Sequence, residues 1–294
     1  MLACCALALA NLPSLKDVEA ARGALVPLRG KDLHFELFVP KAWQPAVPSP
    51  VLVFLHGRGE SGGFDVTNAQ SLPWQLVSGN NASFASSCGF IVVVPQCPQT
   101  CASLNHWMTP TLQNVAALVH DWVVPTLGGD AHRVYLAGQS MGGHGAWIFA
   151  AQQPRLFAAV VVVCGYAQGE QEQSTIAERL VRQGLGVHVY HSADDSVIPV
   201  AASDQMAEAI RRQGKHPERL AYTRYETAPG PPMPEFAHLT GHGSYELAFR
   251  DPGLWSWLLR HECSRCTRPL APWKPLGNYA EAGGDDGGLA GLLG

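Results

Sequence analysis

Charged side chains are scarce in this sequence and form no extended run of one sign. Asp, Glu, Lys and Arg make up 15% of its 294 residues, and the formal net charge is -4. Proteins that bind nucleic acids carry a clustered basic surface, and no cluster of Lys or Arg stands out along this chain. The sequence therefore argues against a nucleic-acid partner.

Long hydrophobic runs are also missing beyond the first ten residues. The longest, residues 156–164, is far shorter than the roughly 20 residues that span a bilayer, so we expect a buried strand there and no integral membrane span. Residues 2–10 are apolar, but no charged region precedes them as it does in a secretory signal. We expect residues 1–30 to be a disordered or targeting segment, most simply a frayed or truncated start. The compartment stays open, with the cytoplasm slightly favoured over secretion.

A second Cys-x-x-Cys pair is absent as well. The eight cysteines include one such pair, Cys263 and Cys266, whereas zinc sites of this kind need two. The pair also follows the periodic part of the chain, so a thioredoxin-like role is not expected. We predict that the protein holds no metal and no organic cofactor.

Apolar runs and amphipathic stretches alternate along the rest of the chain. Strand patterns occupy residues 33–39, 51–56, 90–95, 133–137, 157–164, 186–191 and 219–225. Helical spacing occupies residues 112–124, 141–152, 174–183, 201–213 and 245–260. This alternation predicts an α/β domain, residues 31–261, with a mostly parallel central sheet and helices on both faces. Residues 262–294 are Pro-rich and then Gly-rich, which predicts a partly disordered tail.

The segment Gly138-Gln139-Ser140-Met141-Gly142 fits the pattern G-x-S-x-G. It follows an apolar strand pattern and precedes helical spacing, which is the strand–turn–helix setting of a nucleophilic serine. The glycines let strand and helix pass closely, and the helix directs its positive N-terminal end at the serine. We therefore predict that Ser140 is a nucleophile.

A second glycine-rich segment, residues 55–60 with the sequence LHGRGE, ends an early strand pattern. In this kind of site, such a loop and the residue after the serine supply the two backbone N–H groups that form an oxyanion hole. By position these donors are the N–H groups of Arg58 and Met141. His56 precedes the serine and lies at the root of the loop, so we expect it to be structural.

An activated serine also needs a histidine base and a carboxylate that orients it, and in this setting the acid precedes the histidine in the chain. Asp194 and Asp195 both follow the strand pattern 186–191, and on this ground both remain candidates. His242 lies between two glycines just before the last amphipathic stretch, where a base can reach the serine. His238 is its nearest rival.

Together these segments resemble the α/β-hydrolase superfamily, in its carboxylesterase, phospholipase and thioesterase-like branch. They are most similar to predicted esterases and peptidases related to polyhydroxybutyrate depolymerase and feruloyl esterase. The matching pieces, over about residues 50–260, are VFLHGRGESG, VVVPQCP, VYLAGQSMGGHGAW, VYHSADDSVIP and GHGSYELAFRDPGLWSWLL. The family segment H-G-x-x-D-x-V-x-P aligns with Asp195, and G-H-x-x-W/Y aligns with His242. Ser192 stands where the family has glycine, so Asp194 stays a minor alternative.

The resemblance implies a serine hydrolase without a large cap domain that cleaves carboxylic esters or thioesters. The resemblance implies that the triad is Ser140, His242 and Asp195. The enzyme would react with a small-molecule substrate to form an acyl-enzyme intermediate. A serine peptidase or acyltransferase on the same triad is one alternative, and a catalytically silent hydrolase-fold binding protein is another. Trp107 is a candidate substrate contact, with ordinary packing as the alternative. The oligomeric state is left open.

Overall fold

Eight strands form one central sheet in the computed structural model, which describes residues 12–30, 32–63, 65–78, 88–266, 269–273 and 276. The strands are β1 (Leu25–Arg29), β2 (His34–Phe38), β3 (Ser49–Leu55), β4 (Ile91–Gln96), β5 (Gly129–Gln139), β6 (Ala159–Val163), β7 (Gly186–Ser192) and β8 (Leu220–Tyr225). Their order across the sheet is β1-β2-β4-β3-β5-β6-β7-β8. Strand β2 runs antiparallel to β1 and β4, and the pairs from β4 to β8 are parallel.

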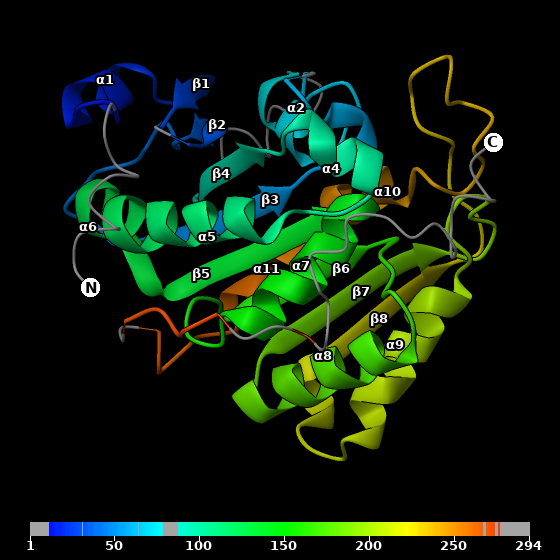
Figure 1. Ribbon diagram of the computed structural model, residues 1–294. Coiled ribbons are helices and arrows are strands. Elements are labelled where there is room, and N and C mark those ends of the chain that lie inside the picture. The colour runs from blue at the N-terminus through cyan, green and yellow to red at the C-terminus, as the bar shows by residue number, and fades with distance from the viewer. Residues whose placement is uncertain are drawn as a thin grey trace.

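Helices cover both faces of this sheet (Figure 1). The α-helices are α1 (Leu15–Ala20), α2 (Leu72–Val77), α4 (Gln99–Leu104), α5 (Thr109–Leu118), α6 (Val124–Leu127), α7 (Met141–Gln152), α8 (Glu170–Gln183), α9 (Ala201–Arg212), α10 (Ser244–Arg250) and α11 (Pro252–Leu259). A π-helical turn, η3 (Val119–Val123), joins α5 to α6, and η2 (Arg58–Glu60) and η4 (Pro217–Arg219) are 3-10 turns. This arrangement confirms the predicted α/β architecture.

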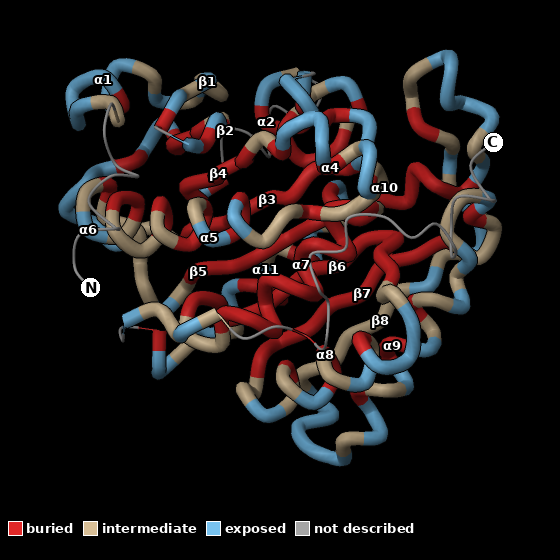
Figure 2. Tube along the Cα trace, viewed as in Figure 1, coloured by how far each residue is buried: buried red, intermediate tan, exposed pale blue. Residues whose placement is uncertain are grey.

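The two faces of the sheet contribute to two separate hydrophobic cores. In β3, Val51, Val53 and Leu55 face one core, which they share with residues of α5, α7, α8 and α9. Leu52 and Phe54 face the other, together with residues of α2, α10 and α11. Because successive side chains of a strand point to opposite faces and both faces are covered, the strand is apolar throughout. Figure 2 shows the result as an almost continuous buried centre.

Several elements differ from the sequence expectation, and the short helices α1, α2 and α4 were not predicted at all. The helix expected over residues 245–260 is two helices, because Asp251 is extended and its carboxylate accepts a hydrogen bond of 2.8 Å from the N–H of Gly253 at the start of α11. The helix expected over residues 112–124 is α5 followed by the π turn. Strand β1 lies inside the segment 1–30, while residues 2–10 and the Gly-rich end of the chain lie outside the described residues.

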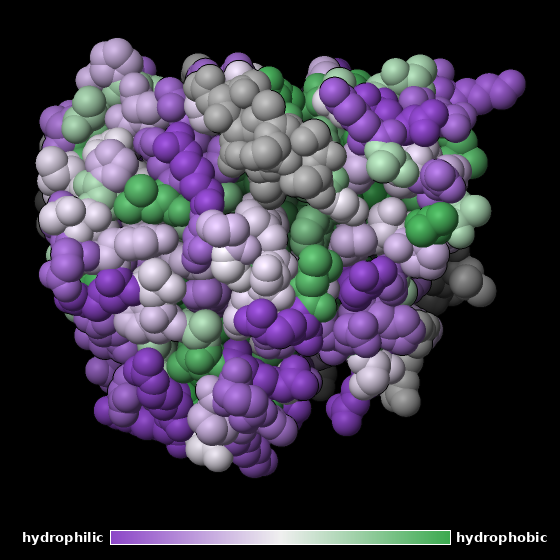
Figure 3. Space-filling model, turned by 180° about the vertical axis from the view of Figure 1, so that it is seen from behind, coloured by the Kyte–Doolittle hydropathy of each residue, from purple (hydrophilic) through white to green (hydrophobic). Residues whose placement is uncertain are grey.

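The face of the molecule seen in Figure 3 is mostly hydrophilic where it is coloured, with hydrophobic residues in small separate groups. The large hydrophobic side chains that are exposed come from scattered elements: Leu15, Val47, Val77, Leu104, Phe236 and Leu259. Among the described helices, none has the length and hydrophobicity to cross a membrane. Two disulfides join described residues, Cys97–Cys101 and Cys263–Cys266.

Candidate active site

Ser140 occupies a sharp turn between the end of β5 and the start of α7. Its backbone has φ 54° and ψ -121°, in a region that residues other than glycine rarely adopt. Holding a residue other than glycine in this conformation costs a free energy of order 1–3 kcal/mol, so contacts with the surrounding structure must keep Ser140 in place. The Ser140 N–H donates to the carbonyl of Val163 at the end of β6 (3.0 Å), and the Ser140 carbonyl accepts from the N–H of His144 in α7 (3.1 Å). The turn is thereby tied to both neighbouring elements.

The two glycines that flank this turn are required by close backbone contacts. A Cβ on Gly138 would lie 2.0 Å from the carbonyl oxygen of Gly142, and one on Gly142 would lie 2.0 Å from that of Leu55. Any side chain at either position would therefore push α7 away from the sheet. The G-x-S-x-G pattern is explained by this packing of helix on strand.

The structure brings Ser140 and His242 together, although 102 residues separate them in the chain. His242 follows β8 in the loop that leads to α10, and its Nε2 lies 3.1 Å from the Oγ of Ser140. Its Nδ1 lies 3.0 and 3.1 Å from the two carboxylate oxygens of Asp195. With Asp195 ionised, Nδ1 carries the ring proton and donates it, so Nε2 is left to accept from the serine hydroxyl. The rival His238 is exposed in the same loop.

Asp195 is buried in the loop after β7, where several donors surround its carboxylate. Oδ1 accepts from the N–H groups of Val197 (2.8 Å) and Ile198 (2.9 Å), and Oδ2 accepts from His191 Nε2 (3.2 Å). Burial by itself would raise the pKa of Asp195, but the hydrogen bonds from His191 and His242 outweigh it and hold the pKa below its usual range. The carboxylate is therefore ionised at neutral pH and fixed in orientation.

Asp194, the alternative acid, has partners other than His242. Its carboxylate accepts hydrogen bonds from the Ser192 hydroxyl and from the N–H of Ala228, the latter at 3.1 Å. It thus joins the loop after β7 to the loop that precedes His242. Ser192, which replaces the glycine of related sequences, uses its hydroxyl in this link.

The two expected oxyanion donors belong to α7 and to the turn η2. Met141 is the first residue of α7, so its N–H has no acceptor within the helix. Arg58 opens the 3-10 turn η2, and the Cβ position of the preceding Gly57 is 3.8 Å from the Cβ of Ser140. The Arg58 side chain points away and donates through Nε to the carbonyl of Ala102 (2.9 Å). The guanidinium is therefore engaged in the neighbouring loop, and the oxyanion role of the Arg58 backbone N–H stays a prediction.

Sequence reasoning missed a buried carboxyl behind this loop. Glu60 is 3% exposed, and its Oε1 accepts from the side-chain amide of Gln139, the residue before the serine (3.4 Å). Burial raises the pKa of Glu60 to about 7, against the lowering effect of the N–H groups of Glu60 and Gly57. Nothing in the pattern LHGRGE distinguishes a buried glutamate from an exposed one, since loop glutamates are mostly solvated.

His191 was also missed as a neighbour of the acid. Its Nε2 lies near two acceptors, Asp195 and the carbonyl of Ile198 (3.0 Å), so Nε2 carries the ring proton. Its Nδ1 then accepts from the hydroxyl of Ser203 in α9 (2.7 Å). The sequence placed this histidine at a strand end, but its orientation depends on packing against α9.

His56 and Trp107 lie behind the oxyanion loop. The His56 Nδ1 donates to the carbonyl of Gly57 (2.7 Å) and its Nε2 accepts from the N–H of Cys97 (3.0 Å), which joins the ends of β3 and β4. The Trp107 side chain is 0% exposed, and its Nε1 donates to the carbonyl of His56 (3.2 Å). The enclosed indole supports the loop from within, which favours the packing alternative for Trp107 over a substrate contact.

One group of possible metal ligands occurs among the described residues, formed by Cys164, Asp195 and His242. Asp195 and His242 already bind each other, and burial raises the pKa of the Cys164 thiol. A thiol that stays protonated is a poor ligand, because metals bind the thiolate. The arrangement suits proton transfer from Ser140 to His242, with Asp195 orienting the imidazole, better than metal binding.

Comparison with known proteins agrees with this geometry. The model of a family described as "Putative esterase" matches residues 28–222, a span that contains Ser140 and Asp195. Acetylxylan esterase A of Emericella nidulans is 35% identical over 95 residues, which cover 30% of this chain and 31% of that protein. A Salmonella typhi protein named "Putative carboxymethylenebutenolidase" is 33% identical over 101 residues, which cover 32% of this chain and 36% of that protein. The chain thus spans about a third of the length of the curated relatives it matches.

Solved structures show the same fold. A thermostable esterase is 25% identical, with a TM-score of 0.62 over 81% of this chain and 63% of its own. The acylaminoacyl peptidase of Pyrococcus horikoshii, at 16% identity, has a TM-score of 0.54 over 82% of this chain and 42% of its own, a likeness of fold alone. The family match extends over about two thirds of the sequence, and the helix-covered sheet agrees with it. This chain therefore belongs to the putative esterase family of α/β hydrolases.

Proposed function

We propose that this protein hydrolyses carboxylic esters of small molecules through Ser140, His242 and Asp195. The observation that carries the proposal is the continuous chain of hydrogen bonds from the Ser140 Oγ through the imidazole to the buried carboxylate. In this mechanism Ser140 attacks the ester carbonyl while His242 Nε2 takes the hydroxyl proton. His242 then returns that proton to the leaving alcohol, and an acyl-enzyme remains on Ser140.

Asp195 and the two backbone donors act at different moments of this reaction. The carboxylate keeps the imidazole in the tautomer that accepts at Nε2 and stabilises the imidazolium that forms. The N–H groups of Arg58 and Met141 hold the negative oxygen of the tetrahedral intermediate, an effect worth about 3–4 kcal/mol for a single donor in other enzymes. Water then attacks the acyl-enzyme, with His242 as base, and releases the acid.

The test is labelling of the protein with a fluorophosphonate probe together with hydrolysis of p-nitrophenyl acetate. Wild type should label on Ser140, and Ser140→Ala should neither label nor turn over ester above about one part in 10⁴ of the wild-type rate. His242→Ala should fall nearly as far, because a serine without its base is a weak nucleophile. A folded wild type that neither labels nor cleaves the ester would refute the proposal and favour a catalytically silent binding protein.

Two further assays on the same protein samples distinguish ester hydrolysis from the alternative reactions of this triad. A p-nitroanilide substrate with the same acyl group reports peptidase-type cleavage, and added short alcohols report acyl transfer. We expect release of acid from the ester to exceed both reactions by at least tenfold. Preferential cleavage of the anilide would instead assign a peptidase.

A further inference from the structure

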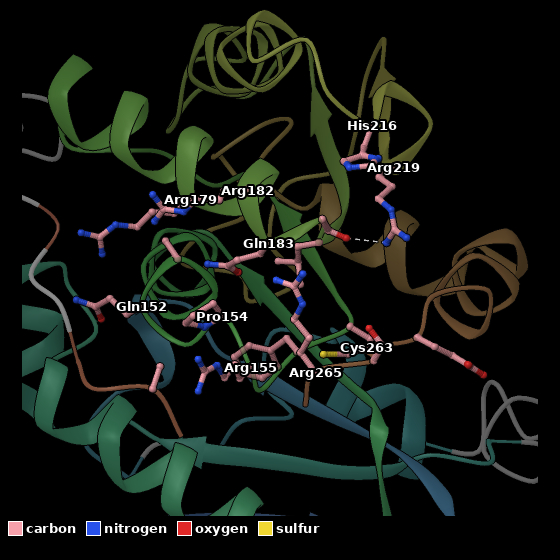
Figure 4. A pocket seen from close by; sticks show the side chains of 18 of the residues that line it. Gln152, Pro154, Arg155, Arg179, Arg182, Gln183, His216, Arg219, Cys263 and Arg265 are labelled. Atoms are coloured by element: carbon pink, nitrogen blue, oxygen red, sulfur yellow. Dashed lines mark hydrogen bonds between the residues drawn. The ribbon is translucent and has the colours of Figure 1, made fainter. Parts of the chain in front are cut away.

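The chain of hydrogen bonds that starts at Ser140 does not end at the carboxylate of Asp195. Asp195 Oδ2 lies 3.2 Å from the Nε2 of His191, and the Nδ1 of His191 lies 2.7 Å from the hydroxyl oxygen of Ser203 in α9. The cavity at the C-terminal ends of α7 and α8 (Figure 4) is lined by none of these residues. The two additional groups therefore belong to the interior around the triad and not to a second pocket.

His191 lies on the face of β7 that packs against α9. Along the strand, Val187 and Val189 contribute to the core on this face, whereas Tyr190 contributes to the core on the other. His191 comes next on the α9 face and is 0% exposed. A buried polar side chain needs hydrogen-bond partners, and here the partners are the hydroxyl of Ser203 on one side and the triad carboxylate on the other.

The two oxygens of Asp195 are held by different groups. Oδ1 accepts from the N–H groups of Val197 and Ile198 in its own loop. Among the described residues, the partner recorded for Oδ2 besides His242 is His191. Burial raises the pKa of Asp195, and the hydrogen bond from His191 is the largest effect that opposes this rise. His191 is thus a main support of the ionised carboxylate that holds the imidazole of His242.

Ser203 decides which ring nitrogen of His191 donates. Nε2 lies near two acceptors, Asp195 and the carbonyl of Ile198, so it carries the ring proton, while Nδ1 accepts from the Ser203 hydroxyl. The hydrogen bond at one ring nitrogen fixes the state of the other, as Asp195 does for His242. Ser203 is 2% exposed and lies in the first turn of α9. The orientation of His191 is therefore set by the packing of α9 on β7.

We propose that His191 is a positioning residue for ester hydrolysis. It keeps the Asp195 carboxylate in the orientation that aims His242 at Ser140, and Ser203 orients His191 in turn. The inference rests on the proposed function and deepens it, because it concerns the same site. Small displacements of catalytic groups lower the rate of the chemical step. His191 is enclosed and is not expected to contact substrate, so we expect its loss to lower kcat and to leave KM unchanged.

Two amide variants separate the hydrogen bond to Asp195 from simple packing. In His191→Gln the terminal amide nitrogen reaches the position of Nε2 and still donates to the carboxylate, whereas the shorter side chain of His191→Asn ends near the position of Nδ1. His188→Asn is the matched control. His188 is buried in the same strand, but it stacks on Tyr190 and its Nε2 lies 3.1 Å from the hydroxyl oxygen of Thr223.

Steady-state hydrolysis of p-nitrophenyl acetate gives the first measurement. We expect His191→Asn to lower kcat at least tenfold with KM changed less than twofold, and His191→Gln to stay within about threefold of the wild-type kcat. His188→Asn should keep kcat within about twofold, even where its melting temperature falls as far as that of His191→Asn. The proposal is overturned by a wild-type kcat in His191→Asn, by equal losses in the Asn and Gln variants, or by an equal loss in His188→Asn.

Ser203→Ala is a second variant that leaves the imidazole in place. It should lower kcat about threefold, because the hydroxyl no longer fixes the tautomer of His191 in this buried network. This variant decides the test if His191→Asn does not fold. A wild-type kcat in Ser203→Ala would then contradict the proposal.

The proton between His242 and Asp195 gives a readout that needs no turnover. In wild type it should produce a low-field proton NMR resonance that is lost in His242→Ala. His191→Asn should shift this resonance, and His188→Asn should not. A wild type that shows the resonance but cleaves no ester would refute the proposed function, and the shift would still test the positioning role. An unshifted resonance in a folded His191→Asn would overturn that role.

Discussion

Two adjacent carboxylates near the imidazole differ in role because they face different partners. Asp195 binds His242 Nδ1 and two loop N–H groups, whereas Asp194 binds Ser192 and the N–H of Ala228. The resemblance to related sequences selects Asp195, and in the structure that is the residue whose carboxylate reaches the imidazole. The residue pattern alone left the two equivalent.

The first prediction compares these two residues directly. Asp195→Asn should lower kcat for p-nitrophenyl acetate by about 10⁴, because the amide no longer holds the imidazole in the productive tautomer. Asp194→Asn removes the same charge one position away and should change kcat by less than tenfold. Steady-state kinetics of the two purified variants measure the difference. Equal losses would show that the charge of the loop matters and not its contact with His242.

The second prediction concerns the buried carboxyl of Glu60, whose pKa is raised from 4.5 to about 7. In the folded state Glu60 stays protonated over a pH range in which the unfolded chain has lost that proton. Its contribution to stability is therefore complete below about pH 4.5 and is lost as the pH rises through about 7. This loss amounts to at most about 3 kcal/mol.

Glu60→Gln removes the titration and keeps a neutral hydrogen-bonding group. The melting temperature of the variant relative to wild type should therefore rise between pH 5 and pH 8. Thermal unfolding at the two pH values measures it, with Glu235→Gln, an exposed site, as the control. A difference that does not depend on pH would show that Glu60 does not titrate in this range.

At the scale of elements, the contact between α7 and β3 depends on the absence of a side chain at position 142. The third prediction is that Gly142→Ala destabilises the protein by at least about 2 kcal/mol, since the new Cβ would overlap the Leu55 carbonyl and force the helix outward. Urea unfolding measures the change. Gly89→Ala is the matched control, because a Cβ there meets nothing within 4 Å. Comparable losses at both sites would exclude the packing explanation.

Helix α7 and strand β3 also show which elements the sequence could predict. Residues 141–152 form α7 with the bounds expected from its spacing, and β3 occupies the apolar run at 51–55. Strand β1 was not predicted. It lies at the edge of the sheet, where it pairs only with β2, and its side chains do not alternate between buried and exposed, so its sequence carries no strand pattern. Helices α2 and α4 have six residues each, too few for periodicity to identify.

At the scale of the whole molecule, the two disulfides of the described residues lie at opposite ends of the strands. Cys97–Cys101 joins the end of β4 to α4 beside the oxyanion loop. Cys263–Cys266 follows α11, and the N–H of Cys263 donates to the carbonyl of His132 in β5 at 2.9 Å. Each therefore fastens a segment next to a strand of the central sheet.

The fourth prediction is that a reducing agent lowers the melting temperature of wild type in two separable parts. Cys97→Ser with Cys101→Ser should cost about 2 kcal/mol, the stabilisation expected for closing so short a loop. Adding the reductant to this double variant should lower its melting temperature further, through Cys263–Cys266. Calorimetry measures both steps. No effect of the reductant on the double variant would mean that the C-terminal disulfide adds nothing to stability.

The sequence by itself determined what depends on neighbours along the chain. Strand and helix periods, the tight turn at Ser140 and the chain order of serine, acid and histidine are all local patterns. They were enough to predict the fold class and to name Ser140 and His242, while the choice of Asp195 over Asp194 came from the resemblance to related sequences. Only the tertiary structure decided which contacts form between distant segments. It places β1 at the sheet edge, buries Glu60 and encloses Trp107. The physical reason is that burial and charge proximity depend on how elements pack, and this packing is not written in the spacing of residues along one element.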